Sequence, residues 1–382
     1  MSTNRNNCPA MLVVLDGFGY RDEKNGNAVA AARMPNFEYL RHHYRSALLQ
    51  AAGEFVGLLP GCIGNSEVGH LTLGAGRVVK SALCRFHQSI DDGSFFERED
   101  LFQVLGGLKK SGKALHVMGL LSDAGVHSHE KHLYALLKLA NQVGLERVYI
   151  HAFLDGRDVP PQSALLYLQH LAHELQNYNG MSLASIHGRF FAMDRDNNWE
   201  RTQQSYDVLC GNAQVPPGLL HDWHAVLEQS YAQGITDEFL VPTLLDAQGA
   251  VREGDGIIFF NVRPDRARQL TQAFIDPACT TIKRTVNSLA FFITSTRFKK
   301  EYKNQVLFED IVVEHTLLDE LAEQLDNKSV FVIAETEKAA HVTYFFRGMR
   351  EQRLVHEQYE LVPSIKTKSY ADCPEMCAKQ IT

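Results

Sequence analysis

The sequence has few of the features that mark a secreted, membrane-spanning or nucleic-acid-binding protein. Its seven cysteines are odd in number and contain no C-x-x-C pair, which favours a reduced protein of the cytoplasm over a disulfide framework. The apolar run Met11–Leu15 is too short for a signal peptide or a membrane span. Lysine and arginine number 38 against 45 acidic residues, and this net negative charge argues against a nucleic-acid-binding surface.

The sequence is also poor in the spacings from which metal sites are built. It has no Asp-His dipeptide, and its one Asp-x-x-x-His runs from Asp123 to His127. Five scattered histidines are predicted to be surface or packing residues: His221, His224, His315, His341 and His356. A self-sufficient site for two metal ions therefore cannot be assembled from these residues.

The sequence does contain a series of apolar segments that end in polar loops. At 382 residues, with 45% hydrophobic and 22% charged residues, the chain is long enough for two globular domains. Four predicted strands and the loops that follow them are 114–121 with Ser122–His127, 148–154 with Asp155–Asp158, 183–187 with Gly188–Arg189, and 256–262 with Arg263–Arg266. Strands that alternate with helices predict an α/β fold with a parallel, doubly wound sheet.

Cationic side chains recur at the predicted carboxyl ends of these strands. Because such ends meet at one edge of a parallel sheet, the side chains are expected to converge. They are His127, Arg157, Arg189, Arg195, Arg263 and Arg266. The planar fork of arginine suits carboxylate and phosphate oxygens, so the set predicts a pocket for a small anion. For any single arginine, an ion pair with a nearby aspartate is the alternative.

A second candidate site centres on Ser66, which lies among glycines directly before a predicted helix. Glycines permit close backbone approach, and a helix N-terminus favours an anion such as phosphate. Asp16 follows the run Met11–Leu15, which is predicted to be a buried strand. Asp16 and Ser66 offer hard oxygen ligands for Mn²⁺ or Mg²⁺, and a metal-bound serine is a nucleophile for phosphoryl transfer. The alternatives are an N-cap serine and a turn aspartate.

Nine segments together resemble the 2,3-bisphosphoglycerate-independent phosphoglycerate mutase family. In chain order they are LDGFG, GNSEVGHLTLGAGR, SDAGVHSH, FLDGRDVPP, GRFFAMDRDNNWER, DEFLVPT, FFNVRPDRARQL, AETEKAAHVTYFF and LVPS. Their combination is far more specific than any one segment. The resemblance implies a parallel-sheet phosphatase domain of the alkaline-phosphatase type, interrupted by an inserted α/β transferase domain. The predicted bounds are 1–80 and 303–382 for the phosphatase domain and 81–302 for the transferase domain.

The resemblance also implies roles for individual residues. Ser66 is the nucleophile that carries the phosphoryl group as a phosphoserine while 3-phosphoglycerate and 2-phosphoglycerate are interconverted, and Asp158 is the general acid or base at the accepting hydroxyl. Asp16 and Ser66 ligate one of two Mn²⁺ ions. The residues implied to hold the phosphoglycerate are His127, Arg157, Asp158, Arg189, Arg195, Arg263, Arg266 and Lys338. The implied protein is a cytoplasmic monomer that acts on this small molecule, without nucleic acid or membrane.

In one respect the sequence departs from the family pattern. Family members continue beyond residue 382 with the aspartate and histidine motifs that supply most metal ligands, so the phosphatase domain is expected to be C-terminally incomplete. A second hypothesis is therefore a catalytically dead short form or pseudoenzyme that only binds phosphoglycerate. A third is another metallo-phosphatase or phosphomutase that acts on a different sugar phosphate, which would leave the arginines unexplained.

Overall fold

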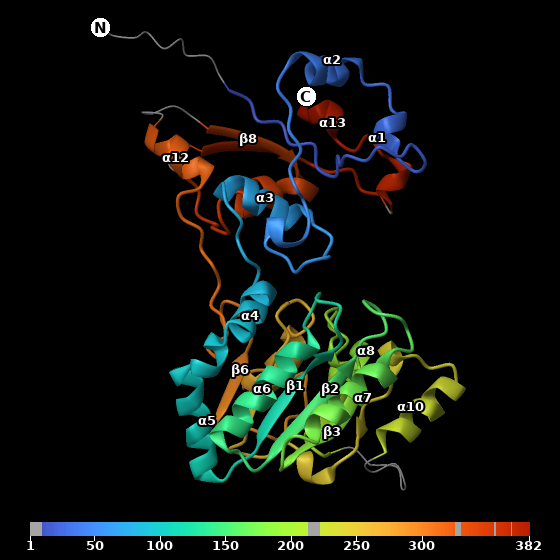
Figure 1. Ribbon diagram of the computed structural model, residues 1–382, viewed down its shortest axis with the longest axis vertical. Helices are drawn as coiled ribbons and strands as arrows, with labels where there is room; N and C mark the ends of the chain where they lie inside the picture. The colour runs from blue at the N-terminus through green and yellow to red at the C-terminus, as the bar shows by residue number, and fades with distance from the viewer. Residues whose placement is uncertain (1–9, 213–221, 325–329, 355–356, 368) are drawn as a thin grey trace. The chain divides into compact units, whose positions relative to one another are not determined.

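The computed structural model describes residues 10–212, 222–324, 330–354, 357–367 and 369–382. The chain divides into two compact units: unit 1, formed by Met1–Val79 and Val312–Thr382, and unit 2, formed by Lys80–Ile311. Unit 2 is one continuous segment of the sequence, inserted between the two segments of unit 1, as the colours of Figure 1 show along the chain. The sequence predicted the second junction at 302/303, whereas it lies at 311/312, because residues 305–306 still pair in the sheet of unit 2.

Unit 2 is built on a seven-stranded sheet with the order β4-β3-β2-β1-β5-β6-β7. Its strands are β1 (Leu115–Leu121), β2 (Val148–Leu154), β3 (Met181–Gly188), β4 (Thr243–Leu244), β5 (Gly256–Phe259), β6 (Phe291–Thr294) and β7 (Gln305–Val306). Neighbouring strands pair in parallel except β3 and β4, which are antiparallel. The predicted doubly wound α/β sheet is therefore confirmed. Leu121 pairs with Leu154, so the loops after β1 and β2 leave the sheet at the same level.

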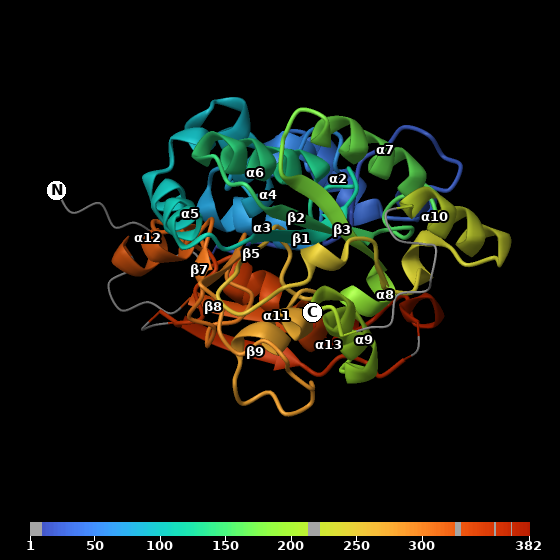
Figure 2. The same ribbon diagram turned by 90° about the horizontal axis from the view of Figure 1, so that it is seen from below.

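Helices cover both faces of this sheet, as Figure 2 shows. They are α4 (Ala82–Asp91), α5 (Glu99–Ser111), α6 (Glu130–Val143), α7 (Ala164–Leu175), α8 (Arg189–Ala192), α9 (Trp199–Leu209), α10 (Trp223–Ala232) and α11 (Arg268–Ile275). On one face, Tyr206 of α9 and Leu270 of α11 share a buried cluster with Met118, Phe153 and Phe259 of the strands. Among the described helices, none combines the length and hydrophobicity needed to cross a bilayer.

Helix α6 illustrates how the local sequence sets an element. Its apolar residues at i, i+3, i+4 and i+7 spacing are buried: Leu133, Leu136, Leu137 and Ala140 are each at most 1% exposed, as expected for an amphipathic helix. The helix ends at Gly144, whose φ of 75° is the left-handed conformation that favours glycine after a helix. The buried face and the end of α6 therefore follow from its residue pattern.

Unit 1 has far less regular structure among its described residues. It contains a two-stranded parallel sheet of β8 (Val330–Glu335) and β9 (Glu357–Val362). Its helices are α1 (Ala28–Ala31), α2 (Pro35–His43), α3 (Ser66–Ala75), α12 (Leu317–Gln324) and α13 (Ala378–Ile381), with a π-helical turn at His341–Phe345. Helix α3 packs closely on that turn, since a Cβ at Gly74 would lie 2.0 Å from the carbonyl oxygen of Phe346.

The predicted buried strand at Met11–Leu15 is wrong for this structure. The run forms no strand, and its side chains are between 37% and 87% exposed. No described strand pairs with the run, and the described sheet of unit 1 consists of β8 and β9. An apolar run becomes a buried strand only where neighbouring backbone and side chains are available to cover it.

We predict that burial on α7 decides the effect of two matched truncations. Leu168→Ala should lower the free energy of unfolding by about 2–5 kcal/mol, because this fully buried side chain would leave a cavity. Leu166→Ala, at a position 51% exposed on the same helix, should change it by less than about 0.5 kcal/mol. Urea unfolding followed by circular dichroism measures both, and equal losses would contradict the assigned buried face.

Candidate active site

In unit 2, the loops after β1, β2 and β3 meet at the buried carboxylate of Asp155. Its Oδ2 accepts a hydrogen bond from the Ser122 hydroxyl at 2.7 Å. Its Oδ1 accepts the guanidinium of Arg189 at 2.6 Å and the backbone N–H groups of Arg157 and Asp158 at 3.2 and 2.9 Å. One carboxylate therefore fixes three strand ends at the carboxyl edge, where ligands bind in open α/β sheets.

Arg189 is as deeply buried as its partner. Its Nη1 contacts Asp155 Oδ1 and Asp158 Oδ2, both at 2.6 Å. Burial alone would lower the pKa of Arg189, but the hydrogen bonds and charges of the two aspartates outweigh it and raise the pKa. Arg189 is therefore a fixed cation that holds Asp158 at the edge of the cluster.

His127 lies between two carboxylates without a close hydrogen bond to either. Its Nε2 is 3.9 Å from Asp158 Oδ2 and its Nδ1 is 3.8 Å from Asp265 Oδ1. Burial lowers the pKa of His127 to about 4, and the neighbouring charge of Arg189 acts in the same direction. The imidazole is therefore neutral near pH 7, able to donate from one nitrogen and accept at the other.

Asp265 organises two further arginines. It contacts Arg195 at 2.9 Å and Arg263 at 3.1 Å. Burial alone would raise the pKa of Asp265, but these arginines, with Arg263 the stronger influence, hold it below its ordinary value. Arg195 and Arg263 are 45% and 52% exposed, so their guanidinium groups can still reach a ligand.

Arg266 is the cation of this set that no described carboxylate pairs with. Its Nη1 donates to the carbonyl of Met193 at 3.3 Å. Burial lowers the pKa of Arg266, and the charges of Arg195, Arg189 and Arg157 lower it further. The predicted cationic residues of unit 2 are therefore brought close enough to repel one another, which is the electrostatic condition of an anion site.

Glu238 completes the surroundings of Arg157. The two groups are 3.2 Å apart. A Cβ at Gly188 would lie 2.5 Å from the carbonyl oxygen of Glu238, so only glycine lets that segment approach the end of β3. Asp155, Ser122 and Glu238 were not predicted as site residues, although they lie in the family segments FLDGRDVPP, SDAGVHSH and DEFLVPT.

A second group of polar residues lies in unit 1. Ser66 is the first residue of α3, and its hydroxyl donates to Asp16 at 2.8 Å (Oδ1) and 2.9 Å (Oδ2). The N-cap of α3 is Asn65, whose side chain accepts the N–H of Val68, so the alternative of Ser66 as an N-cap is wrong. The hydroxyl is instead directed at the predicted carboxylate.

Lys338 also contacts Asp16, with its Nζ 2.8 Å from Oδ2. His341 lies near the same oxygen, with its Nδ1 at 3.9 Å. Burial alone would raise the pKa of Asp16, but hydrogen bonds from Lys338 and Ser66 hold it below its ordinary value. Lys338 and Asp16 are therefore in contact, although the run Met11–Leu15 before Asp16 forms no strand.

The donor atoms present do not fit a two-ion manganese site. Among the described residues, no group of three or more histidine, cysteine or acidic side chains is arranged to hold a metal ion. Asp16 and Ser66 supply oxygen atoms, but the ammonium of Lys338 already neutralises the same carboxylate. Six or so oxygen or nitrogen ligands are the norm for Mn²⁺-like cations, and this cluster offers too few.

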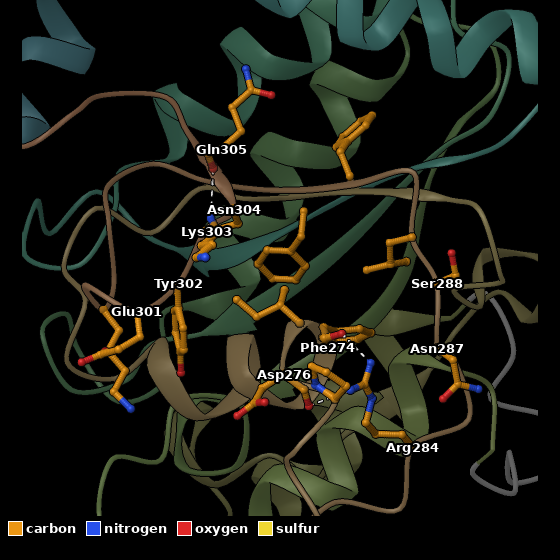
Figure 3. A pocket seen from close by; sticks show the side chains of 16 residues that line it. Phe274, Asp276, Arg284, Asn287, Ser288, Glu301, Tyr302, Lys303, Asn304 and Gln305 are labelled. Atoms are coloured by element: carbon orange, nitrogen blue, oxygen red, sulfur yellow. Dashed lines mark hydrogen bonds between the residues drawn. The ribbon is translucent and has the colours of Figure 1, made fainter.

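A cavity of about 760 Å³ in unit 2 lies away from these residues. Figure 3 shows it between the end of α11 and the segments that lead into β6 and β7, lined by Phe274, Tyr302 and Asn304 among others. These are the amino ends of the strands, whereas the arginines follow carboxyl ends. The guanidinium of Arg284, which also lines the cavity, donates hydrogen bonds to the backbone carbonyls of Asp276 and Phe274.

We predict that the buried ion pair is essential for the stability of unit 2. Asp155→Asn leaves Arg189 with less compensation for its burial, and should lower the free energy of unfolding by about 3–5 kcal/mol. Glu238→Gln, which weakens the pair with the half-exposed Arg157, should cost less than about 1 kcal/mol. Chemical unfolding of both variants measures these changes. An unchanged free energy of unfolding in Asp155→Asn would show that the carboxylate is not needed for stability.

Comparison with known proteins identifies the family. A family profile described as the BPG-independent PGAM N-terminus matches residues 86–300. The phosphoglycerate mutase of the 2,3-bisphosphoglycerate-independent type from Synechococcus sp. (strain JA-3-3Ab) is 48% identical over 374 residues, which cover 98% of this chain and 69% of the relative. That of Symbiobacterium thermophilum is 45% identical over 380 residues, covering 98% and 72%.

The fold comparison agrees. A crystal structure of Leishmania mexicana phosphoglycerate mutase at low cobalt concentration superposes with a TM-score of 0.70 at 29% identity, covering 96% of this chain and 69% of that one. The predicted fold class, an alkaline-phosphatase-like α/β fold with an inserted domain, is supported by this neighbour together with the family profile. From its sequence, its fold and its relatives, the chain belongs to the family of 2,3-bisphosphoglycerate-independent phosphoglycerate mutases.

Proposed function

We propose that unit 2 holds the phosphoglycerate through the arginine cluster while Ser66 of unit 1 carries the phosphoryl group. The reaction is the interconversion of 3-phosphoglycerate and 2-phosphoglycerate, the isomerisation that the family name implies. The observation that carries the assignment is the cationic surplus around Arg266, which has no described carboxylate partner. A substrate with a carboxylate and a phosphate supplies the missing negative charge.

The proposed substrate-binding side chains fall into two groups, half-exposed and buried. Arg157, Arg195 and Arg263 present half-exposed guanidinium groups, which suit bidentate contacts with the phosphate and carboxylate oxygens. Arg189 is buried and acts mainly by holding Asp158. The neutral imidazole of His127 contributes a hydrogen bond without adding charge.

Asp158 is proposed as the general acid or base. Its carboxylate is 2.6 Å from the buried Arg189 and 3.9 Å from His127. It is also 20% exposed, so a bound substrate could reach it. A carboxylate in this position can accept a proton from the hydroxyl that receives the phosphoryl group, and return one to the hydroxyl that loses it.

Ser66 is proposed as the phosphoryl acceptor. In the first transfer, a bond forms between Ser66 Oγ and phosphorus while the bond from phosphorus to the substrate oxygen breaks. The hydroxyl proton of Ser66 points at Asp16, the nearest acceptor in unit 1. Lys338, which contacts Asp16, adds positive charge close to the serine. The reverse transfer, to the other hydroxyl of the glycerate, regenerates Ser66.

Manganese, a monomeric state and a cytoplasmic location remain predictions from the family resemblance. The described donor atoms do not complete a manganese site, so no step above is assigned to a metal. The phosphatase and transferase assignments of units 1 and 2 are likewise proposals, supported by the family profile over 86–300.

We expect Ser66→Ala to lower mutase turnover by about a thousandfold or more, because no other described hydroxyl contacts Asp16. The assay follows conversion of 3-phosphoglycerate with manganese and without 2,3-bisphosphoglycerate. Ser94→Ala is the matched control, since this exposed serine contacts only Asp92 and its own loop. Trapping labelled phosphoserine on Ser66 would support the intermediate, whereas unchanged turnover in Ser66→Ala would refute it.

Binding without catalysis is the second candidate function, because the arginine cluster is complete among the described residues while the metal donors are not. Calorimetric titration with 3-phosphoglycerate should show binding that Arg266→Ala weakens about tenfold to a hundredfold, through loss of charged hydrogen bonds. Arg147→Ala, at the amino end of β2, should leave the affinity unchanged. Binding with no turnover in the wild-type chain would favour this candidate; no binding would refute both.

A further inference from the structure

A continuous chain of buried hydrogen bonds crosses the central strands of unit 2. Asp255 Oδ2 contacts His116 Nε2 at 3.2 Å, and His116 Nδ1 contacts His151 Nε2 at 3.0 Å. His151 Nδ1 and His187 Nε2 both contact the hydroxyl of Ser185, each at 2.7 Å. The three histidines and Ser185 have no exposed surface. We refer to these five side chains as the histidine relay.

The relay follows from the register of the sheet. His151 pairs with Ser185 across β2 and β3, and Phe153 pairs with His187 two residues further along. His116 lies on β1, the other neighbour of β2. Because side chains on a strand alternate between faces, these residues share the face that carries Met118, Phe153 and Phe259. Polar groups thus lie within an otherwise apolar cluster, where each must be satisfied internally.

The direction of every hydrogen bond in the relay follows from Asp255. Its carboxylate also accepts the backbone N–H groups of Ala114 and Arg252, so it is an acceptor and His116 must donate from Nε2. A neutral His116 then accepts at Nδ1 from His151, which accepts in turn from the Ser185 hydroxyl. Ser185 accepts from His187 Nε2. All three imidazoles are therefore assigned the same tautomer, with the proton on Nε2.

The far end of the relay is open. Nδ1 of His187 is buried and has no hydrogen-bond partner among the described residues. The ring packs edge-on against Phe153, with centroids 5.4 Å apart. His187 precedes Arg189 by two positions on β3 and the turn after it, so the open end lies next to the strand end that carries the arginine cluster.

The groups facing the relay are almost all uncharged. Tyr149 of β2 stacks on His116, with centroids 5.5 Å apart, and α9 contributes Tyr206 and Cys210 to the same buried face. Helix α11 contributes Ala267, Leu270, Ala273 and Phe274 to that cluster, and its buried polar residues, Gln269 and Thr271, are uncharged. Among the described residues, Asp255 is the one charged side chain in hydrogen-bond contact with the relay. A second charge has no local compensation.

We propose that the histidine relay is an acid-sensitive lock on unit 2, which holds β5, β1, β2 and β3 together only while its three imidazoles are neutral. Protonation of His116 or His151 adds a donor at Nδ1, where the relay needs an acceptor, and breaks the chain of hydrogen bonds at that position. Protonation of His187 places a buried charge and an unpaired donor at its open Nδ1. The strand end before Arg189 is then released. This inference concerns the stability of unit 2 and does not depend on the proposed catalytic roles.

The sign of the pH effect is fixed by burial. Burial lowers the pKa of His187 to about 3 and lowers those of His116 and His151 as well. In the unfolded chain each returns to about 6.5. Below about pH 6.5 the unfolded state binds protons at these histidines and the folded state does not. The free energy of unfolding therefore has its full value above about pH 6.5 and decreases as the pH falls.

The first test observes the tautomers directly. In the full chain labelled at histidine nitrogen, long-range proton–nitrogen correlation spectra should show His116, His151 and His187 as neutral Nε2–H tautomers that do not titrate between about pH 8 and pH 5. Resonances are assigned with single histidine variants. A protonated imidazole or an Nδ1–H tautomer at any of the three positions would overturn the proposal.

The second test measures how much His187 contributes to the pH dependence of stability. His187→Gln keeps a hydrogen-bond donor toward Ser185 but cannot be protonated. The variant therefore takes up one proton fewer on unfolding below about pH 6. Its folding equilibrium constant should decrease less steeply with falling pH than that of the wild-type chain, by a factor of about ten per pH unit. Urea midpoints measured across this range give the slope. An unchanged slope would overturn the lock.

Ser185→Ala and Ser205→Ala form a matched pair for the hydrogen bonds themselves. Both serines are buried, but Ser205 Oγ has no hydrogen-bond partner among the described residues. Ser185→Ala should lower the folding equilibrium constant about tenfold or more at neutral pH, because two imidazoles lose a partner. Ser205→Ala should change it about threefold or less. Equal effects would show that Ser185 does not link the relay.

Discussion

The site of unit 2 depends on the buried pair of Asp155 and Arg189. Taking both charges out of water is costly, and the cost is offset only because each group is fully engaged by others. Asp155 accepts from the loops after β1, β2 and β3, and Arg189 extends the pair to Asp158. The exposed arginines can therefore vary in position while this anchor stays fixed.

Around this ion pair, the positively charged side chains are only partly balanced by nearby carboxylates. Asp265 serves two arginines at once, and Arg266 has only a carbonyl as partner among the described residues. His127 remains neutral beside them because burial and Arg189 disfavour its protonation. This surplus of positive charge is what supports the proposed binding of a small anion.

Much of this arrangement could be predicted from the sequence. The apolar segments of unit 2 are dense and regularly spaced, so the parallel sheet and the meeting of the loops after β1, β2, β3 and β5 follow from general rules. The ion pair of a single arginine with a nearby aspartate, the alternative stated above, occurs between Arg263 and Asp265, but the sharing of one aspartate by two arginines could not be predicted. Arg263 and Arg195 are far apart in sequence and share Asp265 only because the fold brings them together.

Unit 1 marks the limit of the same reasoning. Met11–Leu15 has the composition of a buried strand, yet it is exposed because strand formation depends on neighbours that a local pattern does not describe. The contact of Ser66 with Asp16 was nevertheless anticipated, since both residues belong to family motifs. Asp155 was missed because its importance lies in how many donors reach it, a property of the folded chain.

The contact between Asp16 and Lys338 spans 322 positions of the chain. During synthesis, which proceeds from the N-terminus, Asp16 and Ser66 emerge long before Lys338, and the whole of unit 2 is made in between. Domains generally fold as units while the chain is being made. A folded unit 2 shortens the flexible loop that must be closed to bring the two parts of unit 1 together, and so lowers its entropic cost. The inserted unit thereby also sets the order of assembly of the serine site.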